Sequence, residues 1–198
     1  FKLKKIQKAE DAFLKVLEIN PRFINTLNNL GVLYIELNDF ENAEKFLRKS
    51  LEINSEVLET NFNLATTLQA IGKIKEAKIF FEKTLKINKN FTRSDLALAM
   101  LEKYQNNNNH IKNLEEKIRD NNINILDQRF LYFALGKVYE DIQNYERSFK
   151  YYKIANDLKK KITKYNIEND KKLFKNIIDF HQNQKKEEIK YSKSDKQI

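Results

Sequence analysis

Hydrophobic and polar residues alternate along the chain with the spacing of amphipathic helices. Between residues 24 and 37 most apolar side chains recur every three to four positions, which places them on one face of an α-helix. Asn38-Asp39 interrupts this pattern, and residues 41–53 resume it with their apolar residues again on one face. The pattern therefore predicts two helices joined by a short turn.

The same pattern returns with a period of 34 residues. The matching positions are Ala9, Ala43 and Ala77; Leu17, Leu51 and Leu85; and Leu30, Leu64 and Leu98. Three independent sets that agree on one period indicate a repeat protein in which each unit is a pair of helices. Leu135 follows Leu98 by 37 residues, so three residues are inserted, and we predict that they lie in the polar run 105–109.

Residues of particular types, among them small, aromatic and leucine residues, recur at fixed places within the units. In the first complete unit and just before it they are Pro21, Leu30, Gly31, Tyr34, Ala43 and Leu47. This spacing resembles the tetratricopeptide repeat, whose antiparallel helix pairs form a right-handed superhelical solenoid. The tryptophan typical of that family's first helix is absent, and its place is taken by Leu27, Asn61, Asp95 and Tyr132.

The resemblance implies an all-α fold divided into repeat units. The expected divisions are a partial unit 1–23, units 24–57 and 58–91, a degenerate unit 92–128, and a last unit 129–162. The chain has only three glycines and one proline, which favours long helices joined by short turns.

Each glycine has an expected structural task. Gly31 and Gly136 lie inside predicted helices, where glycine costs about 1 kcal/mol relative to alanine, so we expect a partner helix to approach them closely. Gly72 follows a first helix, and we expect it to adopt the left-handed backbone conformation. Because the three glycines are far apart, the sequence offers no phosphate-binding loop.

The 34-residue register stops after residue 162. Apolar residues at helical spacing continue, and they are Ile167, Leu173, Phe174, Ile177, Ile178 and Phe180. They predict a capping or linker helix within 163–182, because the end of a solenoid exposes apolar surface that must be covered. Residues 183–198 are polar and charged, and we expect them to form a disordered basic tail.

A second resemblance covers the C-terminal third. Residues 129–160 resemble the last repeat of bacterial sulfotransferases that contain tetratricopeptide repeats, and the stretch after them resembles the linker helix of the same proteins. The residues that carry the likeness are Phe133 to Tyr139, Tyr145, Ser148, Phe149, Tyr151, Tyr152, Tyr165, Ile167, Phe174, Ile177 and Phe180. In that family a strand and a glycine-containing loop that binds phosphoadenylyl sulfate come next, and this sequence contains neither. The resemblance thus implies the repeat region of such an enzyme, with a covalently linked catalytic domain outside this chain.

Charge is concentrated near the C-terminus. The formal net charge is +9, and residues 159–198 carry 12 lysines and 6 acidic residues, whereas the rest of the chain is nearly balanced. A nucleic-acid-binding solenoid would interleave basic and aromatic residues along a groove. Lys159 to Lys161 with Tyr165 form only a weak version of that pattern, and a solvated helix end explains them equally well.

Residues with catalytic or metal-binding chemistry are scarce. The sequence has no cysteine, which excludes disulfides and thiolate-bound metals, and no apolar run near the ~20 residues that span a membrane. We expect His110 to be an exposed turn residue and His181 to end a helix, with no nucleophile or metal ligand beside either. The sequence therefore predicts a cytoplasmic protein that is not an enzyme, with no cofactor, no metal and no membrane association.

In repeats of this type the first helices line a concave groove. The predicted binding surface comprises Asn28, Val32, Phe62, Thr66, Gln69, Arg93, Leu96, Met100, Phe130, Phe133 and Lys137. Apolar residues among polar neighbours suit a docked peptide or protein segment. The alternative is that some of these side chains pack between adjacent first helices. The leading hypothesis is a non-catalytic scaffold with a protein partner; the alternatives are the substrate-recruiting part of a sulfotransferase and a basic nucleic-acid-binding solenoid.

Overall fold

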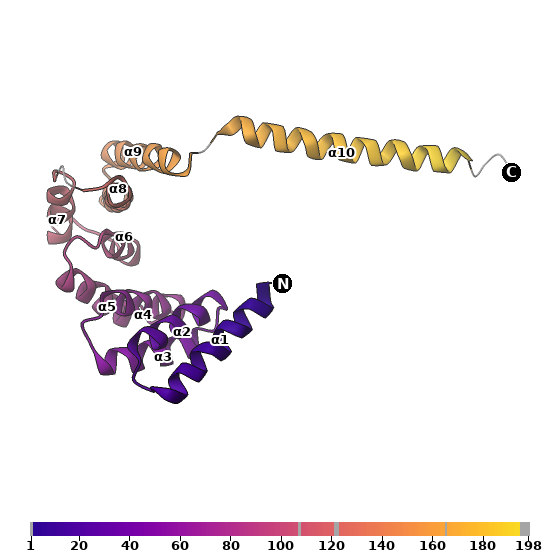
Figure 1. The fold of residues 1–198 in the computed structure, drawn as a ribbon. Coiled ribbons are helices and arrows are strands. Elements are labelled where there is room, and N and C mark those ends of the chain that lie inside the picture. The colour runs from indigo at the N-terminus through magenta and orange to yellow at the C-terminus, as the bar shows by residue number, and fades with distance from the viewer. Residues whose placement is uncertain (1, 107, 121–122, 165, 195–198) are drawn as a thin grey trace. The chain divides into compact units, whose positions relative to one another are not determined.

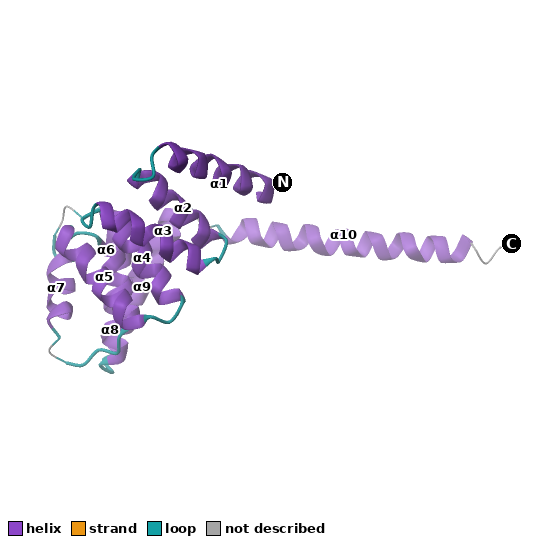
Figure 2. Ribbon diagram, turned by 90° about the horizontal axis from the view of Figure 1, so that it is seen from below, coloured by secondary structure: helices purple, strands orange, loops and turns teal. Residues whose placement is uncertain are grey.

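The described residues of the computed structural model are helical, with turns between the helices and no strand among them (Figure 2). The description covers the whole chain except residues 1, 107, 121–122, 165 and 195–198. The chain divides into two compact units, residues 1–158, here called the repeat body, and residues 159–198, here called the C-terminal unit. The all-α fold predicted from the sequence is confirmed.

The repeat body is a succession of helices in chain order (Figure 1). They are α1 (Lys2–Ile19), α2 (Ile24–Glu36), α3 (Phe40–Ile53), α4 (Leu58–Ala70), α5 (Ile74–Ile87), α6 (Thr92–Leu101), α7 (Asn109–Lys117), α8 (Ile125–Asp141) and most of α9 (Tyr145–Thr163). The first helices of successive units, α2, α4 and α6, begin 34 residues apart, as the periodic sequence predicts.

The core is a row of apolar clusters, each shared by neighbouring helices. Leu30 of α2 and Ala43 of α3 belong to one cluster, which α1 also touches. Leu47, also on α3, belongs to the next cluster together with Leu64 of α4 and Phe81 of α5. The second helices α3 and α5 therefore pack both on their own partners and on the following unit, so that neither of these units buries its apolar face alone.

The glycines inside the helices mark the closest approaches of paired helices. A Cβ atom added at Gly31 would lie 2.5 Å from Cγ of Leu47, and one added at Gly136 would lie 2.6 Å from Cδ1 of Tyr152. Both distances are far below ordinary contact. The expected reason for these two glycines is thus confirmed.

The turn that ends a first helix uses a left-handed residue at the same place in three units. Asn38 has φ 59°, Gly72 has φ 79° and Gln143 has φ 62°. The expected conformation of Gly72 is confirmed. Asp39 then caps α3, since its carboxylate accepts a hydrogen bond from the backbone N–H of Asn42 at 3.2 Å.

The third unit departs from this regular plan. Residues 102–108 connect α6 to α7, whereas 71–73 suffice between α4 and α5. Residues 118–124 connect α7 to α8, whereas 88–91 suffice between α5 and α6. The irregularity is therefore spread over two connections and two shortened helices rather than confined to the asparagine run, and α8 begins at Ile125 rather than at the expected residue 129.

The C-terminal unit contains the end of α9 and the helix α10 (Ile167–Ser194). The predicted helix exists, but it continues through residues 183–194, for which the sequence predicted disorder, so His181 lies inside the helix and not at its end. Its apolar side chains Phe174 and Ile177 are 64% and 45% exposed. That this helix caps the last repeat stays a prediction. No helix in the described parts of either unit is long and apolar enough to span a membrane.

Candidate functional site

The residues predicted for a binding surface all lie on first helices, and we call them the first-helix face. They are Asn28 and Val32 on α2; Phe62, Thr66 and Gln69 on α4; Arg93, Leu96 and Met100 on α6; and Phe130, Phe133 and Lys137 on α8. Met100 is 57% exposed, and the others are half-buried.

On the N-terminal part of this face, polar side chains join neighbouring helices. The amide oxygen of Asn28 accepts hydrogen bonds from the Thr60 hydroxyl and from the Asn63 amide, both at 3.2 Å. The hydroxyl of Thr66 donates to the backbone oxygen of Phe62 at 3.0 Å. Part of the predicted surface thus holds α2 and α4 together.

An arginine that contacts two neighbouring aromatic rings marks the middle of the face. The guanidinium carbon of Arg93 lies 4.7 Å from the ring centre of Phe62 and 4.5 Å from that of Phe91. The same guanidinium donates to both carboxylate oxygens of Glu59, at 2.8 and 2.9 Å. Phe62 also contacts Phe81, with ring centres 5.6 Å apart. Phe62 is therefore mainly a packing residue between helices, the alternative that the sequence left open.

The C-terminal part of the face combines apolar side chains with one ion pair. Leu96 packs against an apolar cluster that α8 shares with α6 and α7, and the ring of Phe133 lies 6.4 Å from that of Tyr152. Lys137 donates to Asp141 one turn later on α8. Met100 is consequently the apolar residue of this face with the most surface available to a partner.

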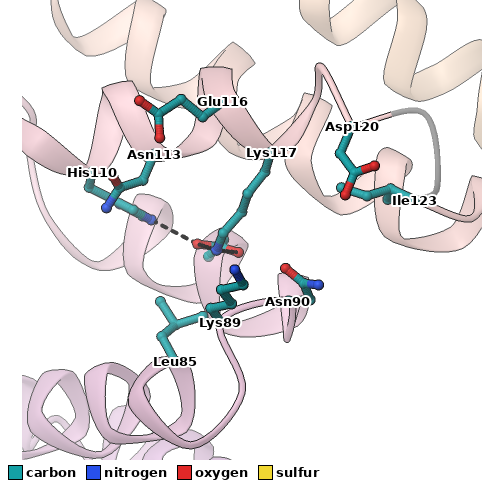
Figure 3. A pocket seen from close by; sticks show the side chains of 10 residues that line it. Leu85, Lys89, Asn90, His110, Asn113, Glu116, Lys117, Asp120 and Ile123 are labelled. Carbon is teal, nitrogen blue, oxygen red and sulfur yellow. Dashed lines mark hydrogen bonds and ion pairs between the residues drawn. The ribbon is translucent and has the colours of Figure 1, made fainter.

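A second constellation, which we call the Asp95 cluster, joins α6 to α7 through Asp95, His110, Lys117 and Tyr104. The carboxylate of Asp95 is fully buried and accepts hydrogen bonds from Lys117 Nζ at 2.7 and 2.8 Å. His110 Nε2 lies 3.1 Å from the same carboxylate (Figure 3). The Tyr104 hydroxyl lies 2.6 Å from His110 Nδ1.

The expectation of an exposed His110 is wrong. Its side chain is only 15% exposed, and both ring nitrogens are within hydrogen-bond reach of a partner. Burial raises the pKa of Tyr104, and the nearby carboxylates of Glu102 and Asp95 add to this effect. Tyr104 therefore keeps its proton at neutral pH, and its hydroxyl bonds to one ring nitrogen of His110 while the Asp95 carboxylate bonds to the other.

Two pockets open beside the Asp95 cluster. The larger, of about 490 Å³, is lined by Leu85, Lys89, Asn90, Asp95, His110, Asn113, Glu116, Lys117, Asp120 and Ile123 (Figure 3). The other, of about 300 Å³, shares Leu85, His110 and Asn113 with it and continues along α5. Among the residues that the structure describes, no group of three or more histidine or carboxylate side chains could hold a metal ion.

Sequence reasoning missed the Asp95 cluster, although one signal for it was present. Asp95 stands in the family's tryptophan position, where Leu27 and Asn61 are also buried. A carboxylate at a core position requires a cationic partner, because an isolated buried charge is very costly. The sequence could not identify Lys117 as that partner, since the long connections of this unit determine which residue of α7 reaches α6.

Comparisons with known proteins agree with the helical plan. Two family models described as tetratricopeptide repeat match residues 22–90 and 131–161, which together make up just over half of the chain. No curated protein sequence matches it.

Several solved structures are similar to the chain. The crystal structure of MamA has a TM-score of 0.61 at 20% identity, covering 83% of this chain and 94% of that one. BtubC from P. vanneervenii has a TM-score of 0.66 at 15% identity, covering 83% and 77%. The pilF protein of Pseudomonas aeruginosa has a TM-score of 0.54 at 19% identity, covering 72% and 64%. At such identities the likeness establishes the fold alone.

Proposed function

We propose that this chain, which belongs to the tetratricopeptide repeat family, is a scaffold that binds a segment of another protein along its first-helix face. Proteins built from stacked repeats use the extended surface formed by successive units for binding. The observation that carries the proposal is Met100, an apolar side chain 57% exposed in a row of half-buried residues on adjacent first helices. A flexible thioether suits a surface that adapts to a partner.

A charge introduced on each side of the repeats tests this proposal. Met100→Lys places a charge on α6 in the first-helix face, and Ile79→Lys places the same charge on the second helix α5, where the side chain is 61% exposed. Partners are captured from cell extract with the wild-type chain and identified by mass spectrometry. Binding of each purified partner is then measured by calorimetry. Met100→Lys should weaken binding at least tenfold, whereas Ile79→Lys should leave it unchanged.

Two outcomes would decide against the proposal. Equal binding by the wild type and Met100→Lys would show that the partner does not bind the first-helix face. Loss of binding only in Ile79→Lys would assign the partner to the second helices instead. Because both side chains are already exposed, neither substitution should lower stability by more than about 0.5 kcal/mol, which a urea titration checks.

The resemblance of residues 129–180 to repeat-containing sulfotransferases supports a second candidate. In it the repeats recruit the substrate for a catalytic domain that lies outside this chain. The model matched at residues 131–161 describes the repeat only, so it supports the repeat and not the enzyme. The natural reading frame beyond Ile198 tests the idea: a strand followed by a glycine-containing loop would support it, and a stop codon would refute it.

A further inference from the structure

The helix α7 is attached to the repeat body differently from the other second helices. It has nine residues, whereas α3 and α5 have 14 each. Only Ile111 and Leu114 of α7 are buried, and both belong to the cluster that is dominated by α8. The same cluster includes Ala99 of α6, whereas α7 makes its polar contacts with its own first helix, α6, through the Asp95 cluster.

Those contacts are charged and depend on one residue. Lys117 and His110, near opposite ends of α7, both reach the carboxylate of Asp95. In the regular units the same interface is apolar, with Leu30 of α2 packed in one cluster with Ala43 of α3. A buried ion pair provides little net stability compared with apolar packing, but the loss of one partner leaves the other charge buried and unpaired.

The space around α7 is also incompletely filled. The two pockets beside the Asp95 cluster, of about 490 and 300 Å³, are lined by residues of α7 together with residues of α5 and α6. A third pocket, of about 390 Å³, is lined by Ile111 and Lys112 together with Tyr139 and Arg147 of α8 and α9. On that side Glu115 accepts a hydrogen bond from the Tyr139 hydroxyl at 2.5 Å. The packing that would make α7 inseparable from its neighbours is therefore reduced.

We propose that α7 is a latch: it is held on the repeat body through Asp95 and detaches locally while the helices on either side stay folded. Elements with few buried apolar contacts open locally at a low free-energy cost. Release of α7 uncovers the part of the α8 surface that Ile111 and Leu114 cover, and it joins the pockets into one opening in the middle of the repeat body. This device is separate from the first-helix face and does not depend on its having a partner.

Hydrogen–deuterium exchange of the full chain, followed by mass spectrometry, tests the latch. Amides of α7 should exchange at least tenfold faster than those of α5 and α8 in the wild type. Asp95→Asn should accelerate the exchange of α7 at least a further tenfold and leave α2 and α3 unchanged, because it leaves Lys117 without its counter-charge. The control Asp157→Asn removes a carboxylate from an exposed pair on α9 and should change nothing in α7.

A second variant distinguishes two explanations of fast exchange in α7: release controlled by Asp95, and fraying because the helix is short. Asp95→Leu combined with Lys117→Met replaces the ion pair by apolar side chains and should slow the exchange of α7 toward that of α8. Fast exchange that this double variant leaves unchanged would show that α7 frays because it is short. Equal protection of α7 and α8 in the wild type, or uniform acceleration of all helices by Asp95→Asn, would also overturn the proposal.

Discussion

Single small residues determine how closely paired helices approach each other. Ala43 and Ala77 occupy equivalent places on second helices, and both are fully buried. A larger side chain there has no free volume to enter, since protein interiors are packed as densely as organic crystals. The same reasoning applies to Gly31 on the first helix of a pair.

Enlarging Ala77 should therefore destabilise the repeat body. Ala77→Leu is expected to lower the free energy of unfolding by about 1–3 kcal/mol through overpacking, measured by urea denaturation. Ala70→Leu is the matched control, because Ala70 ends α4 and is exposed. Equal midpoints for the two variants would mean that the contact at Ala77 is not tight.

Gly31→Ala should also destabilise the repeat body, although alanine has a higher helix propensity than glycine. The propensity gain is about 1 kcal/mol, but the new Cβ would lie 2.5 Å from side-chain carbons of the fully buried Leu47. We expect a net loss of about 1 kcal/mol, because overpacking costs about 1–3 kcal/mol. Adding Leu47→Ala tests the cause: in a double-mutant cycle, the penalty of Gly31→Ala should vanish when Leu47 is already shortened.

At the scale of helices and turns, the regular units were predictable and the third unit was not. The sequence predicted helices at 24–37 and 41–53, and the structure has Ile24–Glu36 and Phe40–Ile53. Periodic apolar residues were enough there, because nothing else competes for the same core positions. In the third unit the charged Asp95 occupies a core position. Its hydrogen-bond partner Lys117 is distant in sequence, so no local pattern reveals it.

The candidate site was predictable only in part. Arg93 and Met100 both lie on α6, and their spacing of seven residues puts them on one face because a helix fixes which residues share a face; that this face binds a partner stays a prediction. It could not show that Arg93 stacks on Phe62 and Phe91, since this depends on the distance between adjacent helices. The sequence also did not show that the connection between α6 and α7 brings Tyr104 to His110.

The turn at the end of the first helices gives a prediction at this scale. Gln143 has φ 62°, a conformation that costs a residue with a side chain roughly 1–2 kcal/mol relative to glycine. Gln143→Gly should therefore raise the free energy of unfolding by about 0.5–1 kcal/mol, after the entropy that glycine adds to the unfolded chain is subtracted. Asn38→Gly should gain less, because asparagine tolerates this region better. Thermal unfolding would refute the idea if Gln143→Gly melted below the wild type.

At the scale of the molecule, buried tyrosines link stability to alkaline pH. Burial, followed by the hydrogen bond to Glu10, raises the pKa of Tyr34 from 10.0 to about 12. Burial is also the main cause that raises the pKa of Tyr104, Tyr139, Tyr151 and Tyr152. These phenols are spread over the repeat body, so their effect belongs to the fold as a whole.

The free energy of unfolding should accordingly fall as the pH rises above 10. Between pH 10 and 12 the unfolded chain releases the proton of Tyr34 while the folded chain retains it, so the stability present below pH 10 is lost as pH passes 12. At about 1.4 kcal/mol per pKa unit, the rise of the Tyr34 pKa alone corresponds to roughly 3 kcal/mol. Urea titrations at pH 8, 10 and 11 measure the slope. Tyr34→Phe should make it shallower, and an identical slope in that variant would contradict the assignment.

The common 34-residue spacing of α2, α4 and α6 also makes the length of this protein adjustable. A unit that begins at Leu58 and ends at Phe91 meets the same kind of neighbour at both ends, so a further copy of it could be spliced in after Val57 without a new interface being invented. The third unit cannot be copied in this way, because its two long connections and its short α7 fit only the neighbours that it has. Internal duplication can therefore lengthen the chain before residue 92, where the units are regular, but not by copying the third unit that follows.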